Sequence, residues 1–432
     1  MFIITLRNEN YKDRLLEEQL KKHLRAFGAV EIVGCMWCGK TWMADAHGVS
    51  KINISSAGIK SLIEADPNLA IEGKNPHIID EWQEVPAIWD KVRIAVDESA
   101  GNRGLFILTG SSTPKKNETV HSGTGRISRI RLRPMSLFET GYSDGSVSLE
   151  ELFNGTFKNA RVQTNLRVFA ELICKGGWPG SMDLEPDAAE LIPYQYLNTL
   201  LSSIAEKTGT SEYALRRILI SLARNIGQTA TYQTLTNDVS EGEPDKNNLN
   251  TRQTIEKFIN IFKDRFIVED MYGWDAPVRS KSRVRVKPKR GFVDPSLPAA
   301  LLGAGRNRLL EDGQLFGRLF EELCLRDLKI YASCMSNALP DAVKYYRDSD
   351  NLEADAIIEL RDGRWAAVEI KLSDNKVAES VRNLLRLKNK VASNPYAENP
   401  EPAFMAVIVG NTEFASRTPE GVYVIPCTSL TA

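Results

Sequence analysis

The stretch that decides the fold runs Val30-Glu31-Ile32-Val33-Gly34-Cys35-Met36-Trp37-Cys38-Gly39-Lys40-Thr41. The apolar run that ends at Val33 predicts a buried strand, and the residues from Lys40 onward predict a helix. Between them lies Gly-x-x-x-x-Gly-Lys-Thr, the spacing of a phosphate-binding loop that joins a strand to a helix. This order predicts an α/β domain built around a parallel sheet.

Each residue type in this loop has a physical role in binding phosphate or magnesium. Glycines let the backbone turn tightly, so that its N–H groups point at phosphate oxygens. The lysine neutralises the β and γ phosphates of a nucleoside triphosphate, and the threonine ligates magnesium. A plain turn is the alternative, and the spacing strongly disfavours it. We expect ATP to contact Gly34, Cys35, Met36, Trp37, Cys38, Gly39, Lys40 and Thr41.

A second part of this site is predicted at Ile78-Ile79-Asp80-Glu81. An apolar strand that ends in two carboxylates is common on protein surfaces. Downstream of a phosphate-binding loop, however, it predicts a role in metal binding and nucleotide hydrolysis. We expect Asp80 to hold Mg²⁺ and Glu81 to orient and deprotonate the attacking water. Together with Lys40, Glu81 is therefore expected to catalyse ATP hydrolysis.

A third strand, residues 105–108, turns small and polar at its carboxyl end, where ligands of open α/β sheets lie. Thr109, Ser111 or Ser112 could there sense the γ-phosphate, and Ser111 is the expected cofactor contact. An ordinary polar loop is an equally favoured alternative. The following arginines at 126, 129, 131 and 133 are mostly expected to be solvated strand charges. An arginine reaching the nucleotide of another copy would require a homo-oligomer.

Length and composition bound the remaining organisation. The 432 residues are too many for one ordinary core, and we expect domains at 1–150, 151–300 and 301–432. A hydrophobic share of 42% and a charged share of 26% are typical of globular proteins. The formal net charge of -1 means that affinity for nucleic acid would need a local basic surface.

Targeting signals and cysteine spacing give further expectations. No apolar run approaches a membrane span, and the first residues lack the order of a signal peptide, so we expect a cytoplasmic protein without a membrane partner. The six cysteines are scattered, unlike a disulfide framework. Cys35 and Cys38 form a Cys-x-x-Cys, which permits a redox or zinc interpretation. Their place inside the phosphate-binding loop disfavours it.

Four segments together carry a family resemblance: residues 32–41, 78–86, 108–112 and 125–139, the last ending Leu-Arg-Pro-Met-Ser-Leu-Phe-Glu. The combination resembles a prokaryotic family of AAA+-superfamily ATPases, over nearly the whole chain. The resemblance implies a P-loop NTPase (AAA+-like) parallel sheet domain, a helical and winged-helix region, and a C-terminal α/β domain resembling restriction endonucleases. It implies ATP binding more firmly than a biological role.

The middle region adds a candidate DNA surface. Residues 212–223, 231–238 and 251–262 predict three short helices with loops like those of helix-turn-helix modules. The segment after them alternates basic residues, which in a strand would project from one side and suit phosphate contacts. Three-helix packing without nucleic acid and a charged edge strand are the alternatives. The predicted DNA contacts are Arg279, Lys281, Arg283, Arg285, Lys287 and Lys289.

The resemblance to restriction endonucleases points to an acidic residue near a strand start, followed by Glu-x-Lys on the next strand. Glu369 and Lys371 share one face of a predicted strand because side chains repeat every two residues. Asp355 could reach that face across a hairpin, and Glu321 on a preceding helix is a further acidic candidate. We expect Asp355 and Glu369 to hold a metal and Lys371 to stabilise charge beside an activated water.

Two functional hypotheses follow. The first is an ATP-dependent protein that contacts DNA and carries a nuclease-like end. The rival is a nucleotide switch or protein-interaction scaffold whose nuclease-like domain is inactive, since a fold can be inherited without its activity.

Overall fold

The computed structural model describes residues 6–56, 58–112, 123–240, 251–277, 279, 280, 283 and 286–432. Contacts group the chain into two units, Met1–Met135 with Asp264–Ile267, and Ser136–Lys263 with Val268–Ala432. The second unit therefore contains both the region predicted as a helical middle and the C-terminal region. Among the helices of the described residues, none combines the length and apolar composition of a membrane span.

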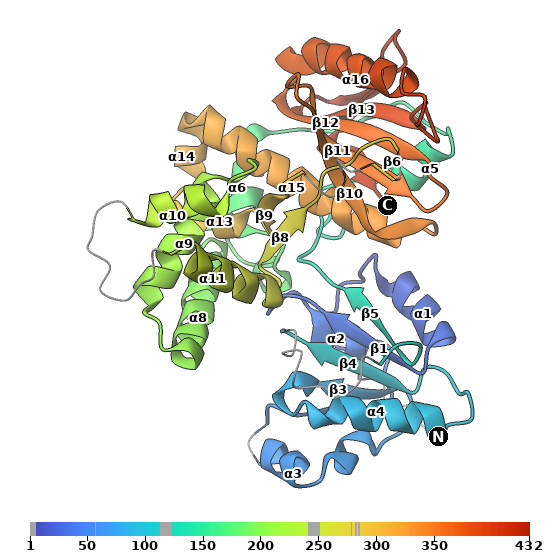
Figure 1. Ribbon diagram of the computed structural model, residues 1–432, viewed down its shortest axis with the longest axis vertical. Helices are drawn as coiled ribbons and strands as arrows, with labels where there is room; N and C mark the ends of the chain where they lie inside the picture. Colours follow the sequence, from blue (N-terminus) through green and yellow to red (C-terminus); the bar gives the residue numbers. More distant parts are fainter. Residues whose placement is uncertain are drawn as a thin grey trace. The chain divides into compact units, whose positions relative to one another are not determined.

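The first unit is built around a parallel sheet (Figure 1). Within its described residues, the sheet has five strands in the order β2-β3-β4-β1-β5, and neighbouring strands all run parallel. The predicted parallel α/β domain is thus confirmed. Its main elements are α1 (Glu17–Ala26), β1 (Ala29–Val33), α2 (Lys40–Asp45), β2 (Ser50–Asn53), α3 (Ile59–Ala65), β3 (His77–Asp80), α4 (Ala87–Glu98), β4 (Phe106–Gly110) and β5 (Ile127–Arg131).

Burial explains why these segments form a sheet core. All residues of β1, β3 and β4 are buried, as expected for strands covered on both faces. Ile79 and Leu108 pack in one cluster with Ile88 and Val92 of α4. Because the strands are parallel, the carboxyl ends of β1, β3 and β4 meet at one edge of the sheet. The phosphate-binding loop follows β1 at that edge.

The second unit begins with helices. The three predicted short helices are present as α9 (Glu212–Arg224), α10 (Tyr232–Ser240) and α11 (Arg252–Asp264), with buried apolar faces. After them, β8 (Val268–Met271) pairs antiparallel with β9 (Lys289–Phe292). The other main helices of this region are α5 (Leu149–Phe153), α6 (Leu166–Lys175), α7 (Pro186–Ala189), α8 (Leu191–Thr208), α13 (Ser296–Leu301) and α14 (Arg306–Glu311).

A mixed sheet forms the C-terminal part of this unit, where the sequence predicted strands and helices. Across the described residues it has seven strands in the order β10-β11-β12-β13-β15-β14-β7. Its elements are β7 (Ala160–Arg161), α15 (Gly313–Cys334), β10 (Ala338–Arg347), β11 (Glu353–Leu360), β12 (Trp365–Ser373), α16 (Val377–Ala392), β13 (Phe404–Asn411), β14 (Phe414–Arg417) and β15 (Tyr423–Pro426).

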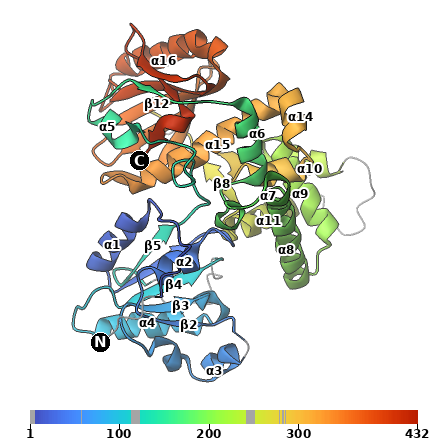
Figure 2. The same ribbon diagram turned by 180° about the vertical axis from the view of Figure 1, so that it is seen from behind.

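Two long helices cover opposite faces of this sheet (Figure 2). Val407 and Val409 of β13 pack in one cluster with Leu384 of α16. Gly410, one position further on, lies against Phe320 of α15, where an added Cβ would come within 3.0 Å of the ring. Successive strand residues point to opposite faces, so α16 and α15 lie on either side. The restriction-endonuclease-like assignment of this domain stays a prediction.

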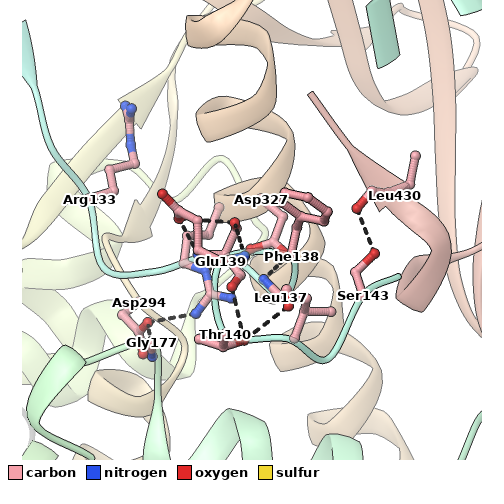
Figure 3. Close-up of polar contacts among 12 residues, drawn as sticks. Arg133, Leu137, Phe138, Glu139, Thr140, Ser143, Gly177, Asp294, Asp327 and Leu430 are labelled. Atoms are coloured by element: carbon pink, nitrogen blue, oxygen red, sulfur yellow. Dashed lines mark hydrogen bonds and ion pairs between the residues drawn. The ribbon is translucent and has the colours of Figure 1, made fainter. Parts of the chain in front are cut away.

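A buried ion-pair cluster joins distant segments of the second unit (Figure 3). Arg326 on α15, 3% exposed, pairs with Asp294 and Asp327 at 2.8 Å each. Asp294 also accepts from the backbone N–H of Gly177 at 3.0 Å, and Asp327 from that of Leu137 at 2.9 Å. We call these five residues the Arg326 cluster: Arg326, Asp294, Asp327, Gly177 and Leu137.

The same contacts explain why the first unit ends before the predicted boundary at residue 150. Leu137 is bound to Asp327, and the hydroxyl of Ser143 donates to the backbone carbonyl of Leu430 at 2.7 Å (Figure 3). A short strand, β6 (Val147–Ser148), pairs with β16 (Leu430–Thr431). Residues 136–148 therefore belong to the second unit by their contacts, which no local sequence pattern indicates.

Candidate functional site

The phosphate-binding loop has the geometry that its sequence predicts. Gly34 has φ of 157° and Gly39 has φ of 97°, and a Cβ at Gly34 would lie 2.2 Å from the carbonyl oxygen of Leu132. Lys40 opens α2, is 5% exposed, and donates to the backbone carbonyl of Cys35 at 2.8 Å. The lysine thus lies across the inside of the loop, where a phosphate group would fit.

Asp80 is brought to the start of α2 at the sheet edge. Thr41 Oγ1 donates to Asp80 Oδ1 at 2.8 Å, and the hydroxyl of Thr109 donates to the same oxygen. A hydroxyl and a carboxylate at this distance are hard oxygen ligands of the kind that Mg²⁺ prefers. The residues present therefore fit a magnesium ion.

Glu81 follows Asp80 in a left-handed conformation, with φ of 56°. Its backbone N–H donates to Thr109 Oγ1 at 3.1 Å, and Ser111 Oγ donates to its carboxylate at 2.8 Å. Gln83 Nε2 contacts the same carboxylate oxygen. A carboxylate oriented by two donors at a strained backbone position is arranged to act on a nearby group. Ser111 holds Glu81 here, and its contact with a nucleotide stays a prediction.

Three polar side chains at this site were missed by the sequence reasoning. Lys51 Nζ lies 3.6 Å from Asp80 Oδ2 and 3.0 Å from Asp45 Oδ1, and Asn53 donates to Asp80 Oδ2 at 3.4 Å. Gln83 is the third. Asn53 pairs with Asp80 in the register of β2 and β3. Only the strand order, which places β2 beside β3, could have indicated the contacts of Lys51 and Asn53.

The two cysteines of the loop are fully buried. Burial raises the pKa of the Cys35 thiol, and the contact with Cys38 raises it further. For Cys38, burial acts in the same direction, but the hydrogen bond from Cys35 and the charge of Lys40 together lower its pKa to about 6. Cys38 Sγ also donates to the carbonyl of Leu132 at 3.5 Å. Both side chains thus pack inside the loop, and the thiol of Cys38 contacts the chain just after β5.

The arginines near β5 are occupied within the first unit. Arg126 pairs with Asp97 at 2.8 Å and Arg129 with buried Glu31 at 2.7 Å. The indole of Trp82 donates to the same Glu31 at 3.0 Å. For Arg126 and Arg129, this agrees with the interpretation as strand charges.

A second charged site lies where β11 and β12 separate. Asp355 is one position beyond the last pair, Ala356 with Val368, and its carboxylate accepts from the backbone N–H of Ile370 at 2.7 Å. Lys371 Nζ donates to Asp355 at 3.1 Å and to Glu369 at 2.6 Å. The structure thus brings together the three residues that the sequence pattern grouped, and we call them the Lys371 triad.

Electrostatics in the Lys371 triad follow from burial. Burial, followed by the charge of Asp355, raises the pKa of Glu369 to about 8, and the same two causes raise that of Glu321 to about 8. Burial lowers the pKa of Lys371, but Asp355 and Glu369 outweigh it and the pKa is raised. Among the described residues, no group of three or more His, Cys, Asp or Glu side chains could hold a metal ion. A metal here would rest on the two carboxylates of Asp355 and Glu369.

The structure departs from the predicted ridge of basic residues at Arg283 and at Lys289. Arg283 is bound to Glu359, with Arg283 Nη2 2.7 Å from Glu359 Oε1, and Lys344 contacts the same carboxylate. Lys289 is 6% exposed and lies 5.1 Å from the ring centroid of Tyr345. The strand β9 begins only at Lys289, so the alternation that the prediction assumed does not hold at 286–288, the described residues directly before it.

The remaining predicted contacts divide into two groups. Arg279 and Lys287 are exposed, as the prediction requires. Lys281 and Arg285 lie outside the described residues. Arg283 does not lie on the predicted surface because it pairs with the buried carboxylate of Glu359. Lys289 packs against the ring of Tyr345 instead.

With this geometry in view, comparison with known proteins separates the parts of the chain. Residues 27–141 match an AAA domain. The first unit therefore carries an AAA-type, ATPase-like domain, which agrees with the phosphate-binding loop and with Asp80. Residues 166–308 and 316–430 match two domains of unknown function, DUF8612 and DUF4143. The C-terminal match does not test the restriction-endonuclease prediction.

The chain is also similar to whole proteins. It is 23% identical over 375 residues to the uncharacterized proteins Mb2031c of Mycobacterium bovis and Rv2008c of Mycobacterium tuberculosis, covering 85% of this chain and 76% of each relative. Similar solved structures include the Walker-type ATPase paby2304 of Pyrococcus abyssi, with a TM-score of 0.43 and 12% identity over 69% of this chain and 98% of that one. The ORC2 protein of Aeropyrum pernix has a TM-score of 0.32 and 12% identity over 72% and 98%. These structural scores are too low to support an inference.

Proposed function

We propose that the protein binds and hydrolyses ATP at the edge of the first sheet. The observation that carries this proposal is the hydrogen bond from Thr41 to Asp80, which unites the phosphate-binding loop with the end of β3. Beside it, Glu81 is held by Ser111 and Gln83. Loop, metal ligands and base thus occupy one sheet edge, as hydrolysis requires.

The residues divide the work of hydrolysis. The backbone of residues 34–39 binds the phosphates, and Lys40 is in reach of their β and γ oxygens once it leaves the carbonyl of Cys35. Thr41 and Asp80 would hold Mg²⁺, which when bound neutralises charge on the phosphates. Glu81 orients a water and accepts its proton, while Ser111 and Gln83 fix the carboxylate in position.

We further propose that the second unit acts on DNA. The succession of α9, α10 and α11 followed by the antiparallel pair of β8 and β9 is the element order of a winged helix. Exposed Arg279 and Lys287 lie in the chain between the two strands. The Lys371 triad supports metal-dependent cleavage at the C-terminal sheet.

A second candidate function is a nucleotide-dependent switch whose C-terminal domain is inactive. The contact of Lys371 with both carboxylates favours it, because the ammonium already neutralises the charge that a metal would need. In that case the domain would grip a partner rather than cut DNA.

ATP turnover with and without duplex DNA distinguishes the two candidates. We expect the full-length protein to hydrolyse ATP with Mg²⁺ and DNA to raise the rate, whereas Glu81→Gln should lower turnover on the order of 10²–10⁴-fold under both conditions. A rate that no duplex, single-stranded or branched DNA changes would favour the switch. Absence of turnover in the wild-type protein would contradict the proposed ATPase.

The DNA surface is tested by reversing one charge. Lys287→Glu should weaken DNA binding about equally across sequences and reduce the slope of log K against log salt by about one, because a phosphate contact releases counterions. Lys22→Glu, an exposed lysine of the first unit, is the matched control. Arg283→Glu should instead lower the thermal stability, since it places a carboxylate beside buried Glu359. An unchanged salt slope for Lys287→Glu would remove this segment from the DNA surface.

A further inference from the structure

A buried arginine contacts the phosphate-binding loop and is not used by the functions proposed above. Arg14 is 5% exposed and lies in the turn before α1. Its Nη1 donates to the backbone carbonyl of Cys38 at 2.9 Å, and its Nη2 donates to that of Arg133 at 2.7 Å. A guanidinium stays charged and donates in several fixed directions. One side chain therefore joins the loop to the chain that follows β5.

The bond from Arg14 fixes the direction of one N–H group of the loop. In a planar trans peptide, the carbonyl of one residue and the N–H of the next residue point in opposite directions. The carbonyl of Cys38 points at Arg14, so the N–H of Gly39 points away from it. Gly39, with φ of 97°, directly precedes α2 in the part of the loop that binds phosphate oxygens. Arg14 therefore orients a donor of the nucleotide site without reaching the nucleotide itself.

Two carbonyls of the loop accept from charged side chains, but the two bonds differ. Cys35 accepts from Lys40 at 2.8 Å, a bond that breaks when the lysine turns to a phosphate. Cys38 accepts from Arg14, which comes from outside the loop and keeps its bond when a phosphate enters. Lys40 thus supplies a positive charge that moves to the ligand, and Arg14 supplies one that stays.

The chain that follows β5 holds the loop at both of its ends. The strand β5 lies beside β1 and runs parallel to it, so the two chains leave the sheet at the same edge (Figure 1). The carbonyl oxygen of Leu132 lies 2.2 Å from the place of a Cβ on Gly34, and it accepts from Cys38 Sγ at 3.5 Å. Arg14 adds a bridge from Cys38 to Arg133. The loop is thus fixed against this chain before any ligand binds.

Arg14 is itself held in place by Glu17. The N–H of Arg14 donates to Glu17 Oε1 at 3.1 Å, and the hydroxyl of Tyr11 donates to the same oxygen at 2.8 Å. Glu17 Oε2 lies 3.2 Å from Nε2 of His47, which follows α2 in the chain. The segment 11–17 therefore contacts the chain both before and after α2, and its arginine is preorganised for the loop.

We propose that Arg14 is a positioning residue for the α- and β-phosphates of the nucleotide, a role that rests on the proposed ATP site. It holds the N–H of Gly39 toward the phosphates and adds a permanent positive charge to that of Lys40. Backbone N–H groups of such a loop bind the α- and β-phosphates, which ATP and ADP share. Loss of Arg14 should therefore weaken both nucleotides alike. The water that attacks the γ-phosphate is oriented by Glu81, so the rate at saturating ATP should hardly change.

The test compares Arg14→Met with Arg14→Lys in the full-length protein. Arg14→Met keeps an apolar stem and removes the charged donors, so the Kd of ATP and that of ADP should each rise by roughly tenfold. Arg14→Lys keeps the charge but cannot donate in two fixed directions, so both Kd values should rise by only about threefold. Isothermal titration calorimetry gives each Kd and the number of sites per chain, and phosphate release at saturating ATP gives kcat. Arg25→Met, at an exposed arginine of α1, is the control and should bind both nucleotides like the wild type.

Three results would overturn this role for Arg14. The first is a wild-type Kd for both nucleotides in Arg14→Met. The second is a lower number of sites with unchanged Kd, which is the result of a purely structural role. The third is a loss of kcat with unchanged Kd, which would assign Arg14 to the chemical step.

Failure of the proposed ATP site gives a different result. A wild-type protein that binds neither nucleotide refutes that site and the role of Arg14 with it, whereas unchanged binding in Arg14→Met refutes the role of Arg14 alone. Thermal unfolding shows whether Arg14→Met folds. If it does not, Arg14→Lys supplies the test, and a Kd equal to that of the wild type in this variant would contradict the proposal.

Discussion

The nucleotide site and the Lys371 triad both combine carboxylates with lysine, but they use the lysine differently; in the nucleotide site even Lys51 Nζ lies 3.6 Å from Asp80 Oδ2. In the nucleotide site, Lys40 donates to a backbone carbonyl, and Asp80 and Glu81 are bound chiefly by hydroxyls and amides. In the triad, Lys371 contacts both carboxylates directly. The first arrangement leaves negative charge available for a cation and a proton. The second neutralises its own charge and must rearrange before it can bind a metal.

The largest expected effect separates Lys40 from Glu81. Lys40→Ala should abolish ATP binding, because it removes the counter-charge of the phosphates, whereas Glu81→Gln should keep binding and lower kcat on the order of 10²–10⁴-fold. Fluorescent-nucleotide titration and a phosphate-release assay measure the two quantities. Lys22→Ala is the control for loss of an exposed positive charge. Equal loss of binding in both variants would show that these roles are wrongly divided.

The next effect tests whether the triad acts at all. Asp355→Ala, Glu369→Ala and Lys371→Ala should each reduce Mn²⁺-dependent DNA cleavage by about 10²-fold or more while ATP turnover is unchanged. Gel assays on duplex, single-stranded and branched DNA measure cleavage, and ATP turnover controls for folding. If the wild-type protein cuts none of these and Lys371→Ala changes nothing, the triad is a structural ion pair.

A smaller effect concerns the pH dependence of stability at helix α15. Burial raises the pKa of Glu322 on α15 to about 7, although the charge of Lys329 and a hydrogen bond from Phe292 N–H oppose it. The folded state then holds a proton that the unfolded state releases near pH 4.5, so stability is lost as pH rises from about 4.5 through 7. Glu322→Gln should flatten this decline, which amounts to at most on the order of 3 kcal/mol.

Urea unfolding of the full-length protein between pH 4.5 and 8 measures this slope. Glu311→Gln, at an exposed position of α14, is the control and should keep the wild-type slope. If Glu322→Gln declines with pH as steeply as the wild type, the Glu322 carboxyl is ionised in the folded protein throughout this range.

The smallest effect is expected at the two cysteines of the loop. Cys35→Ser and Cys38→Ser conserve size, and the backbone contacts of both residues, such as Cys35 O with Lys40, remain. ATP turnover should therefore change less than about threefold. This is a change of less than about half of the roughly 1.4 kcal/mol of activation free energy that corresponds to a tenfold change in rate. Turnover that followed the ratio of reduced to oxidised thiol in the wild type, and not in the serine variants, would instead assign the pair a redox role.

Residues close in sequence were predicted well. The conformation of the loop from Gly34 to Thr41 and the position of Asp80 at a strand end could be predicted from neighbouring residues alone, because the residue spacing and the apolar pattern are local. Glu369 and Lys371 were grouped from the two-residue repeat of strands, Asp355 was added from the resemblance to restriction endonucleases, and Lys371 contacts both carboxylates.

Residues whose partners are distant were not predicted. Lys51 and Asn53 reach Asp80 only because β2 lies beside β3, an adjacency that no local pattern contains. The failure at Arg283 has the same origin. Its partner Glu359 lies 76 positions further along the chain, and a buried carboxylate recruits a cation more strongly than solvent does.

The Arg326 cluster has a consequence for making fragments of this protein. A cut at residue 310, between the segments that match separate domains of unknown function, would divide Asp294 and Gly177 from Arg326. The C-terminal piece would keep a buried guanidinium without its full complement of acceptors, and the other piece an uncompensated carboxylate, each a penalty of several kcal/mol. During synthesis, likewise, Leu137 and Asp294 must wait for α15 to leave the ribosome, because their partners Asp327 and Arg326 lie on that helix.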